Sequence, residues 1–288
     1  VLWGNGSIPS EITGTVNVTN IFGNVTQTSA SSIILSDEPV FVEEVTAGAE
    51  NRDPTLWRKD AGIRINGSVP WVIQLPNGTY RMYYTDMGSI YSALSTDSLS
   101  WTAESGTRLT AGIGTEACIG DSSVIRLSNG TYRMYYQASE SSSTHHYIAS
   151  AWSQDGLSWS REGIRYNSTG TLDNGFAGTP DVIQLPNGSY RMYYVGNGGN
   201  ATCALFSADT LNWAREGVVL GPIALDPHVI QLHDGAYRMF YTRPKPPDIV
   251  GSLRIETAYS ADGLIWERES GVKLYPDSVY DSSVLMDP

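Results

Sequence analysis

The chain has 288 residues, with 30 acidic and 18 basic side chains and a formal net charge of −12. This charge argues against nucleic acid and against an anionic membrane surface as partners, because both require a positive protein face. No apolar run approaches the length of a transmembrane helix. The chain begins at Val1 rather than Met, from which we expect a removed leader and a secreted or cell-surface protein.

Residues 1–30 differ in composition from the rest of the chain. They are rich in Thr, Val and Asn, and β-branched residues alternate with others from Ile12 to Val18. Alternation of this kind is typical of strands. We therefore predict a β-rich N-terminal extension over residues 1–30, packed on the main domain or on a neighbouring molecule, and a main domain over residues 31–288.

The main domain is organised around one repeated segment. VIQLPNGTYRMYY (Val72–Tyr84) recurs as VIRLSNGTYRMYY from Val124, VIQLPNGSYRMYY from Val182 and VIQLHDGAYRMFY from Val229, and a truncated copy, DSSVLMDP, begins at Asp281. Each full copy predicts two strands joined by a hairpin, because Asn-Gly and Asp-Gly supply the positive φ that such turns require. Units of about 50 residues that each hold several short strands are typical of propeller blades.

A second repeated element, a turn followed by tryptophan, closes each unit. It reads STDSLSW, SQDGLSW, SADTLNW and SADGLIW, and once, before any full repeat, NRDPTLW. We expect its tryptophans to fill the gaps between blades rather than to stack on sugars; they are Trp57, Trp101, Trp159, Trp213 and Trp266. The repeat pattern begins with an outer strand of a blade, before the first full repeat, and ends with an inner strand. We therefore expect Ser283–Met286 to be the inner strand of the blade whose outer strands come from about residues 33–65.

These repeats predict an all-β, five-bladed β-propeller with N-/C-terminal strand closure. The order of inner strand, Y-R-M-Y-Y and S-x-D-G-x-x-W resembles the five-bladed β-propeller glycosidase superfamily, which includes arabinanases, β-xylosidases, invertases and levansucrases. The resemblance covers residues 53–288. It implies catalytic carboxylates at the mouth of the central channel, namely an Asp base or nucleophile on the first blade, an orienting Asp on the second and a Glu acid on the third.

The ring of residues at the start of the inner strands fits that pattern only in part. It reads Val69, Asp121, Thr179, Asp226 and Asp281. Val69 occupies the position that the resemblance assigns to the catalytic base. Asp121 matches the orienting Asp of the second blade. The inner strand of the third blade begins Thr-Pro-Asp and has no Glu at the position of the acid. Glycoside cleavage needs two carboxyl groups flanking the bond.

The candidate catalytic residues are therefore Asp121, Asp226, Asp281 and Glu116, with Asp173 in a further loop that could reach the mouth. We expect no two of them to converge on an open pocket at the separation that hydrolysis needs, roughly 6.5–9.5 Å for an inverting or about 5–5.5 Å for a retaining reaction, and hence little hydrolysis. The alternatives are a carboxylate pair moved to other blades, or aspartates that fix loops by accepting backbone N–H groups.

Candidate ligand-binding residues at the mouth are Trp71 and His228. Trp71 either offers a platform for a sugar or seals the channel, and His228 either carries a proton or is simply packed. His145 and His146 are adjacent, so a strand would point them to opposite sides. We expect no metal site and no cofactor.

Nine N-x-S/T sequons make glycosylation a hypothesis; they lie at Asn5, Asn17, Asn24, Asn66, Asn77, Asn129, Asn167, Asn187 and Asn200. Cys118 and Cys203 allow one disulfide or two free thiols. Two functions remain open. One is a carbohydrate-active protein that binds or processes glycans, and the other is a structural subunit of an extracellular assembly, joined to copies of itself through residues 1–30.

Overall fold

The structure is a computed structural model that describes three strands near the N-terminus and then residues 62–112, 114–140, 145–168, 173–244, 253–271 and 273–274. The chain divides into two compact units, Val1–Trp57 and Arg58–Pro288. The first unit contains β1 (Val16–Thr19), β2 (Val25–Thr28) and β3 (Phe41–Glu43), which form an antiparallel sheet in the order β2-β1-β3. The N-terminal extension therefore contains strands, as predicted.

The segment Phe41–Glu43 falls in the range predicted for the main domain, whereas β3 pairs with β1 of the first unit. The consecutive apolar residues Val40, Phe41 and Val42 are compatible with a strand but do not specify its partner. The boundary expected at residue 30 stays a prediction, because the residues on both sides of it lie outside the described part of the chain.

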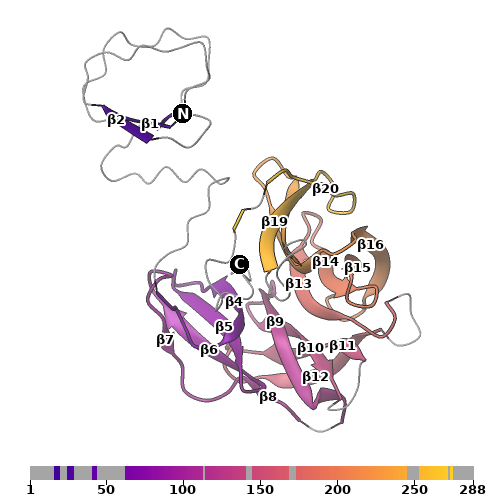
Figure 1. Cartoon of the computed structure of the whole chain (residues 1–288). Coiled ribbons are helices and arrows are strands. Elements are labelled where there is room, and N and C mark those ends of the chain that lie inside the picture. Colours follow the sequence, from indigo (N-terminus) through magenta and orange to yellow (C-terminus); the bar gives the residue numbers. More distant parts are fainter. Residues whose placement is uncertain are drawn as a thin grey trace. The chain divides into compact units, whose positions relative to one another are not determined.

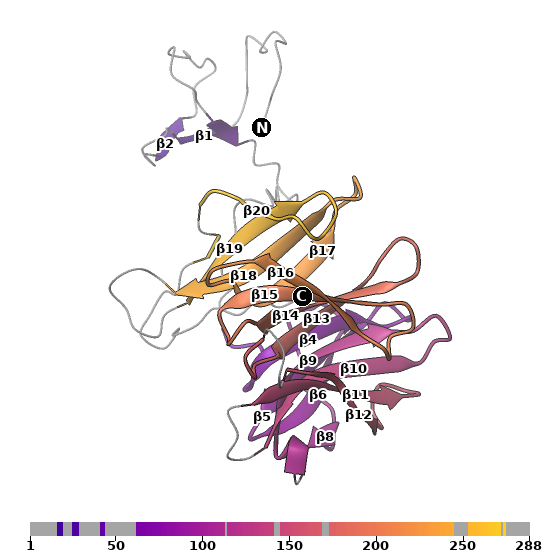
Figure 2. The same ribbon diagram turned by 90° about the vertical axis from the view of Figure 1, so that its right-hand side faces the viewer.

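Four antiparallel sheets of the second unit are arranged as blades, which Figures 1 and 2 show from two sides. The first contains β4 (Ser68–Gln74), β5 (Tyr80–Asp86), β6 (Ser89–Ser95) and β7 (Thr102–Ala103), and β8 (Leu109–Thr110) also pairs with β6. The second contains β9 (Cys118–Arg126), β10 (Tyr132–Ser139), β11 (His146–Ser153) and β12 (Ser160–Asn167). The third contains β13 (Gly178–Gln184), β14 (Tyr190–Gly196), β15 (Ala201–Ser207) and β16 (Ala214–Leu220). The fourth contains β17 (Leu225–Gln231), β18 (Tyr237–Pro244), β19 (Leu253–Ser260) and β20 (Glu267–Arg268).

The described residues thus form four blades, one fewer than the five expected. The segment Ser283–Met286 and residues 44–61 lie outside the described part, as do Asp281 and Trp57. The strand closure therefore stays a prediction. A short 3₁₀ helix, η1 (Gly114–Glu116), precedes β9. Within the described residues, no helix has the length and apolarity that crossing a membrane requires.

The hairpin turns have the geometry that their sequence predicts. Gly78, Gly130, Gly188 and Gly235 have φ values of 85°, 87°, 85° and 88°. In the first turn the Asn77 side chain accepts a hydrogen bond from the backbone N–H of Thr79 at 3.1 Å. A left-handed φ is unfavourable for residues with a branched Cβ, so glycine is needed here for its backbone and not for space.

Gly78 allows the need for a positive φ to be tested without a steric clash, because a Cβ atom built on it would meet no atom within 4 Å. We expect Gly78→Val to lower the free energy of unfolding by on the order of 1 kcal/mol or more, measured by urea denaturation. Gly78→Asn should cost clearly less, because Asn tolerates the left-handed region. Equal losses for the two variants would contradict the explanation.

The tryptophans of the repeated turns pack between blades, as expected. Each of three lies edge-on against a tyrosine of the preceding blade, in the pairs Tyr83–Trp159 (5.8 Å between ring centroids), Tyr135–Trp213 (5.5 Å) and Tyr193–Trp266 (5.8 Å). Trp101 packs against the buried Met82 and Tyr84. Edge-to-face aromatic pairs add to the burial of apolar area, so these tryptophans stabilise the contact between neighbouring sheets.

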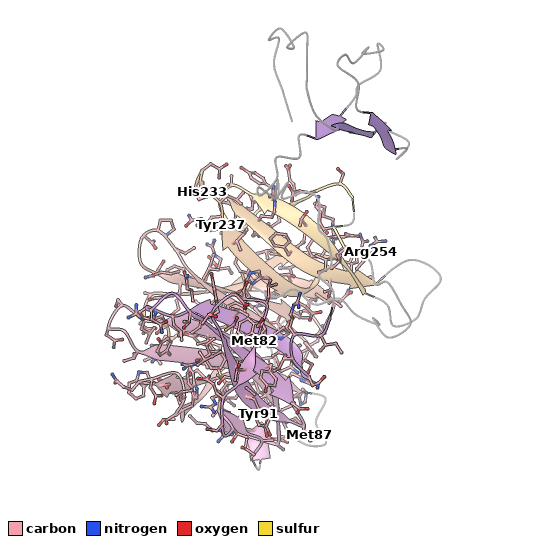
Figure 3. The ribbon with its side chains drawn as sticks, turned by 90° about the vertical axis from the view of Figure 1, so that its left-hand side faces the viewer. Met82, Met87, Tyr91, His233, Tyr237 and Arg254 are labelled. Carbon is pink, nitrogen blue, oxygen red and sulfur yellow. The ribbon has the colours of Figure 1, made fainter. Side chains whose placement is uncertain are left out.

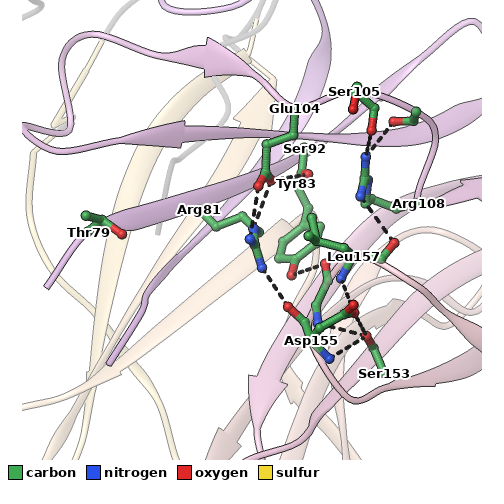
Figure 4. A network of polar contacts seen from close by, with 12 residues as sticks. Thr79, Arg81, Tyr83, Ser92, Glu104, Ser105, Arg108, Ser153, Asp155 and Leu157 are labelled. Carbon is green, nitrogen blue, oxygen red and sulfur yellow. Dashed lines mark hydrogen bonds and ion pairs between the residues drawn. The ribbon is translucent and has the colours of Figure 1, made fainter. Parts of the chain in front are cut away.

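An arginine and a tyrosine of each Y-R-M-Y-Y strand reach the next blade. Arg81 donates two hydrogen bonds to the Glu104 carboxylate, at 2.9 and 3.0 Å, and a third to the carbonyl of Asp155 in the second blade, at 3.0 Å. The Tyr83 hydroxyl donates to the carbonyl of Gly156 at 3.0 Å (Figure 4). We call this arrangement the Arg–Glu latch. It recurs as Arg133–Glu162 with Thr210 and as Arg191–Glu216 with Asp262.

Candidate functional site

Each inner strand begins with an irregularity at the ring position. The pairing register of the inner strand shifts around Val69, Asp121, Thr179 and Asp226. These residues have positive φ values of 46°, 50°, 45° and 49°. Such bulges redirect side chains at the end of a strand. Because β-branched residues rarely adopt this conformation, Val69 and Thr179 show that the fold imposes it.

The four strand ends meet around one pocket, as the ring alignment predicted. Its empty volume is about 470 Å³, part of which is open to solvent. It is lined by Val69, Pro70, Trp71, Asp121, Ser122, Thr179, Pro180, Asp226, Pro227 and His228. The structure thus brings together Asp121, Asp226, Trp71 and His228, whereas Asp281 lies outside the described residues.

Asp121 and Asp226 are the two candidate carboxylates that lie at one pocket, and the expectation that no two candidates stand at a catalytic separation stays a prediction. They come from the second and fourth blades and line the same pocket. Burial, followed by the negative charge of Asp226, raises the pKa of Asp121 to about 6. Burial also raises the pKa of Asp226, although a 2.6 Å hydrogen bond from the Thr242 hydroxyl opposes this. The sequence analysis missed the pair because the repeat gives each residue a ring position but not a partner across the channel.

The alternative that Asp121 fixes a loop finds no support in the described residues, where its carboxyl accepts no hydrogen bond. The Asp226 carboxyl is bonded by a side-chain hydroxyl rather than by a backbone N–H. A buried carboxyl without hydrogen-bond donors is poorly stabilised in its ionised form. These two carboxyls are therefore candidates for chemistry rather than for loop structure.

Trp71 and His228 lie edge-on to each other, with ring centroids 5.5 Å apart. The Trp71 Nε1–H donates to the carbonyl of Val124 in the next blade at 3.0 Å, so its indole is held in place. His228 Nδ1 lies 3.7 Å from Oδ1 of Asp181. Trp71 therefore packs against the hydrophobic core and also lines the pocket.

Asp181 occupies the same repeat position as Trp71 and His228, one residue before the Val-Ile pair. It is almost fully buried, and its Oδ2 accepts the backbone N–H of Val229 in the next blade at 2.6 Å. Ser123, at the same position of the second blade, accepts the backbone N–H of Val182 at 3.2 Å. This position joins neighbouring inner strands. The repeat alignment marks it, but nothing in the sequence indicates what its side chains bond.

Glu116 and Asp173 do not line the pocket. Glu116 pairs with Arg161 and accepts a hydrogen bond from the Tyr136 hydroxyl at 3.0 Å. Asp173 is fully buried and pairs with Arg215 at 3.0 Å. Burial opposes its ionisation, but hydrogen bonds from Arg215, Tyr166 and Tyr194 outweigh this and lower the pKa of Asp173 to about 2. Both acids therefore serve in ion pairs, a buried one for Asp173 and a partly exposed one for Glu116, and neither is a pocket carboxylate.

These ion pairs follow one pattern, which we call the Arg–acid–Tyr triad. The arginine comes from the outermost strand and the tyrosine from the second strand of the same blade. The triads are Arg161–Glu116–Tyr136, Arg215–Asp173–Tyr194 and, in the fourth blade, Arg268–Glu256–Tyr241. Each of these blades therefore holds an arginine–acid ion pair, and the acid comes from a different place in each, namely η1, the loop before β13 and β19.

The remaining candidates have ordinary surroundings. His146 packs against Phe176 with ring centroids 4.6 Å apart, and burial lowers the pKa of His146, as does the neighbouring His145. Among the described residues, no group of three or more His, Cys, Asp or Glu side chains is placed to hold a metal ion. Cys118 is exposed and Cys203 buried, and both are free, so no disulfide joins them.

Comparison with known proteins places this geometry in a fold family. No family model and no curated protein matches the sequence. Among solved structures, a thermostable family-43 glycoside hydrolase matches with a TM-score of 0.59 and 20% identity, over 71% of this chain and 72% of that one. A family 117 glycoside hydrolase from Zobellia galactanivorans matches with a TM-score of 0.59 and 17% identity, over 73% of this chain and 71% of that one. A putative glycoside hydrolase from Parabacteroides distasonis matches with a TM-score of 0.61 and 15% identity, over 76% of this chain and 78% of that one.

The chain shares the β-propeller fold of these glycoside hydrolases. The resemblance stated from the repeats is thereby confirmed at the level of the fold. Identities of 20% or less carry no residue roles, so the chemistry of this propeller has to be argued from its own pocket.

Proposed function

We propose that this propeller binds a glycan at the mouth pocket and cleaves a glycosidic bond with Asp121 and Asp226. The observation that carries the proposal is the convergence of these two carboxyls on one pocket. Glycoside hydrolysis requires one carboxyl that is protonated and one that is ionised, on either side of the scissile bond. The raised pKa of Asp121 supports the first requirement at mildly acidic pH.

In this proposal Asp121 is the general acid and Asp226 the base or nucleophile. A pKa of about 6 leaves a useful fraction of Asp121 protonated at the pH where Asp226 is ionised. The hydrogen bond from Thr242 favours the ionised form of Asp226. The indole of Trp71, fixed by its bond to Val124, would stack on a sugar ring at the pocket wall.

The arrangement departs from the one that the family resemblance implies. Val69 and Thr179 occupy the first-blade and third-blade positions and carry no carboxyl. The proposed pair lies instead on the second and fourth blades. A carboxylate pair moved around the ring was one of the alternatives left open by the sequence, and the shared pocket supports it.

Release of reducing sugar from arabinan, xylan, fructan and other plant and algal glycans tests the proposal. Turnover should fall by on the order of a hundredfold or more in Asp226→Asn, because the variant keeps the shape of the pocket but lacks a base. A glycan that binds the wild type and is weakened by Trp71→Ala, with no turnover in either protein, would make the protein a glycan-binding module and overturn the catalytic part.

We also propose that the protein acts outside the cell, with a fifth blade completed by residues from both ends of the chain. Support for secretion comes from the sequons at Asn66, Asn77, Asn129, Asn167, Asn187 and Asn200, all of which are exposed. A second candidate function is a subunit of an extracellular assembly. Its support is the separate N-terminal unit, whose sheet β2-β1-β3 lies outside the repeats and could pair with a neighbouring copy.

A further inference from the structure

The triad of the fourth blade differs from the other two in its charge. Glu256 is 7% exposed and pairs with Arg268, as the pattern predicts, but also with Arg243 and Arg254. We call these three residues the arginine cluster. Glu116 and Asp173 each form an ion pair with an arginine, whereas the described residues of the fourth blade place three arginines around one glutamate, an excess of two positive charges. This excess is unexpected in a chain with a net charge of −12.

The contacts of the cluster leave donors available for a ligand. Arg254 Nε donates to Glu256 Oε1 at 2.6 Å, and Arg268 donates to the Tyr241 hydroxyl and to the carbonyl of Pro222, both at 2.8 Å. Arg243 only approaches Glu256, with Nη1 3.5 Å from Oε2. Its side chain is 31% exposed and, among the described residues, has no hydrogen bond.

When no ligand is bound, two arginines of the cluster repel each other. Arg243 on β18 lies directly opposite Arg254 on β19. Like charges at such a cross-strand position are destabilising. One carboxylate that is already bonded to Arg254 compensates only part of this repulsion. A second anion between the guanidinium groups would relieve it, and Arg side chains bind carboxylate and sulfate groups with paired N–H donors.

The cluster lies at the same end of the blade as the mouth pocket. Arg243 follows Thr242, whose hydroxyl binds Asp226 in the pocket. Figure 3 shows Arg254 at the end of the blade opposite to Tyr237 and His233, the latter in the hairpin turn on the far side. A chain-like ligand that fills the pocket could therefore place a neighbouring unit near the cluster.

We propose that the arginine cluster binds an oxyanion substituent, a carboxylate or a sulfate ester, on an acidic glycan held at the mouth of the propeller. This inference rests on the proposed function, because it assumes a glycan in the pocket. The overall negative charge disfavours a dense polyanion such as nucleic acid, whereas a ligand with isolated anionic groups is repelled less. The substrate class is therefore an acidic polysaccharide rather than a neutral arabinan, xylan or fructan.

The test uses the full chain and compares oligogalacturonides with their methyl-esterified forms, which keep the same sugar backbone but replace each charged carboxylate by a neutral ester. A sulfated oligosaccharide of similar length is the third ligand. Isothermal titration at low and moderate salt gives each dissociation constant. We expect at least one acidic oligosaccharide to bind tenfold or more tightly than the neutral ester. Arg243→Gln should remove that difference, and it keeps two arginines around Glu256, so the fold should persist.

Arg126→Gln is the matched control, because Arg126 is an exposed arginine of β9 outside the latch, the cluster and the pocket. It removes the same charge and should leave the preference for the acidic ligand unchanged. Thermal melting reports whether each variant is folded. Inorganic sulfate, followed through the arginine Nε–H NMR signals, probes the cluster without any glycan.

The outcomes separate the two proposals. Equal binding of acidic and neutral oligosaccharides would overturn the acidic-glycan inference and leave the proposed function standing. An acidic preference that Arg126→Gln reduces as much as Arg243→Gln would also overturn it, since long-range charge would then be sufficient. Sulfate binding with no binding of any oligosaccharide would overturn both, and the cluster would be a site for an adventitious ion only.

Discussion

Replacing Asp121 by asparagine is expected to make the protein more stable at pH 7 while removing its activity. The pKa of Asp121 is raised to about 6, so the folded protein disfavours the ionised form that predominates at neutral pH. Against an ordinary value near 4, this corresponds to roughly 1–3 kcal/mol of stability lost on ionisation. Asparagine has nearly the same shape and cannot ionise, so the variant avoids this loss.

The sign of the pH dependence follows from the raised pKa. Below about pH 4 the carboxyl is protonated in both the folded and the unfolded chain, and the two proteins should be equally stable. Between about pH 4 and pH 6 the unfolded chain releases its proton first, so the stability of the wild type falls while that of Asp121→Asn does not. Urea midpoints at pH 4 and pH 7 for both proteins measure this difference.

The same variant should lower turnover by on the order of a hundredfold or more, because it cannot donate a proton to the leaving group. A gain in stability together with a loss of activity is the signature of a residue kept for function. If Asp121→Asn is destabilised equally at both pH values, the carboxyl has a structural role as a hydrogen-bond acceptor, and the proposed acid is wrong.

Arg81→Ala is expected to cause a large loss of stability, about 3–5 kcal/mol in the free energy of unfolding. The Arg81 side chain is 8% exposed and that of Glu104 is 13% exposed. The variant leaves the glutamate without its partner and removes the bond to Asp155 in the second blade. An unpaired, mostly buried carboxylate is costly, and the contact between the two blades weakens at the same time.

Urea denaturation of three variants separates these contributions. Arg126→Ala, on the surface, should change the free energy of unfolding by no more than about 0.5 kcal/mol. The double variant Arg81→Met with Glu104→Leu should recover part of the loss, because it leaves no unpaired charge. A small loss for Arg81→Ala, comparable to that of Arg126→Ala, would show that the latch contributes little to holding the blades together.

Much of the blade architecture could be predicted from the sequence, because the repeat states the same local information several times. Turn glycines such as Gly78 require a positive φ, and tryptophans such as Trp159 follow a turn at a fixed distance, so position in the repeat translates directly into position in a blade. Phe41 shows the limit of that reasoning. A short apolar run outside the repeats is compatible with a strand, but the partner of that strand depends on contacts that the run does not encode.

The site was less predictable for a related reason. Asp121 and Asp226 are separated by a whole blade, and only the assembled ring shows that they share a pocket and influence each other's charge. Glu116 shows the opposite case. Its position before β9 suggested that it could reach the mouth. The pairing of β11 with β12 instead places Arg161 where it forms an ion pair with the Glu116 carboxylate.

The left-handed backbone at the ring positions has a consequence for how such a protein can change over evolutionary time. The φ values at Val69, Asp121, Thr179 and Asp226 agree within a few degrees, at 46°, 50°, 45° and 49°, although the side chains differ. The repeat therefore fixes the direction in which each side chain leaves the strand, whatever residue is present. Aspartate tolerates this conformation better than valine or threonine. Replacing Val69 or Thr179 by aspartate would consequently relieve backbone strain. A single substitution could therefore give a descendant protein a new arrangement of carboxylates around the pocket, with the blades unchanged.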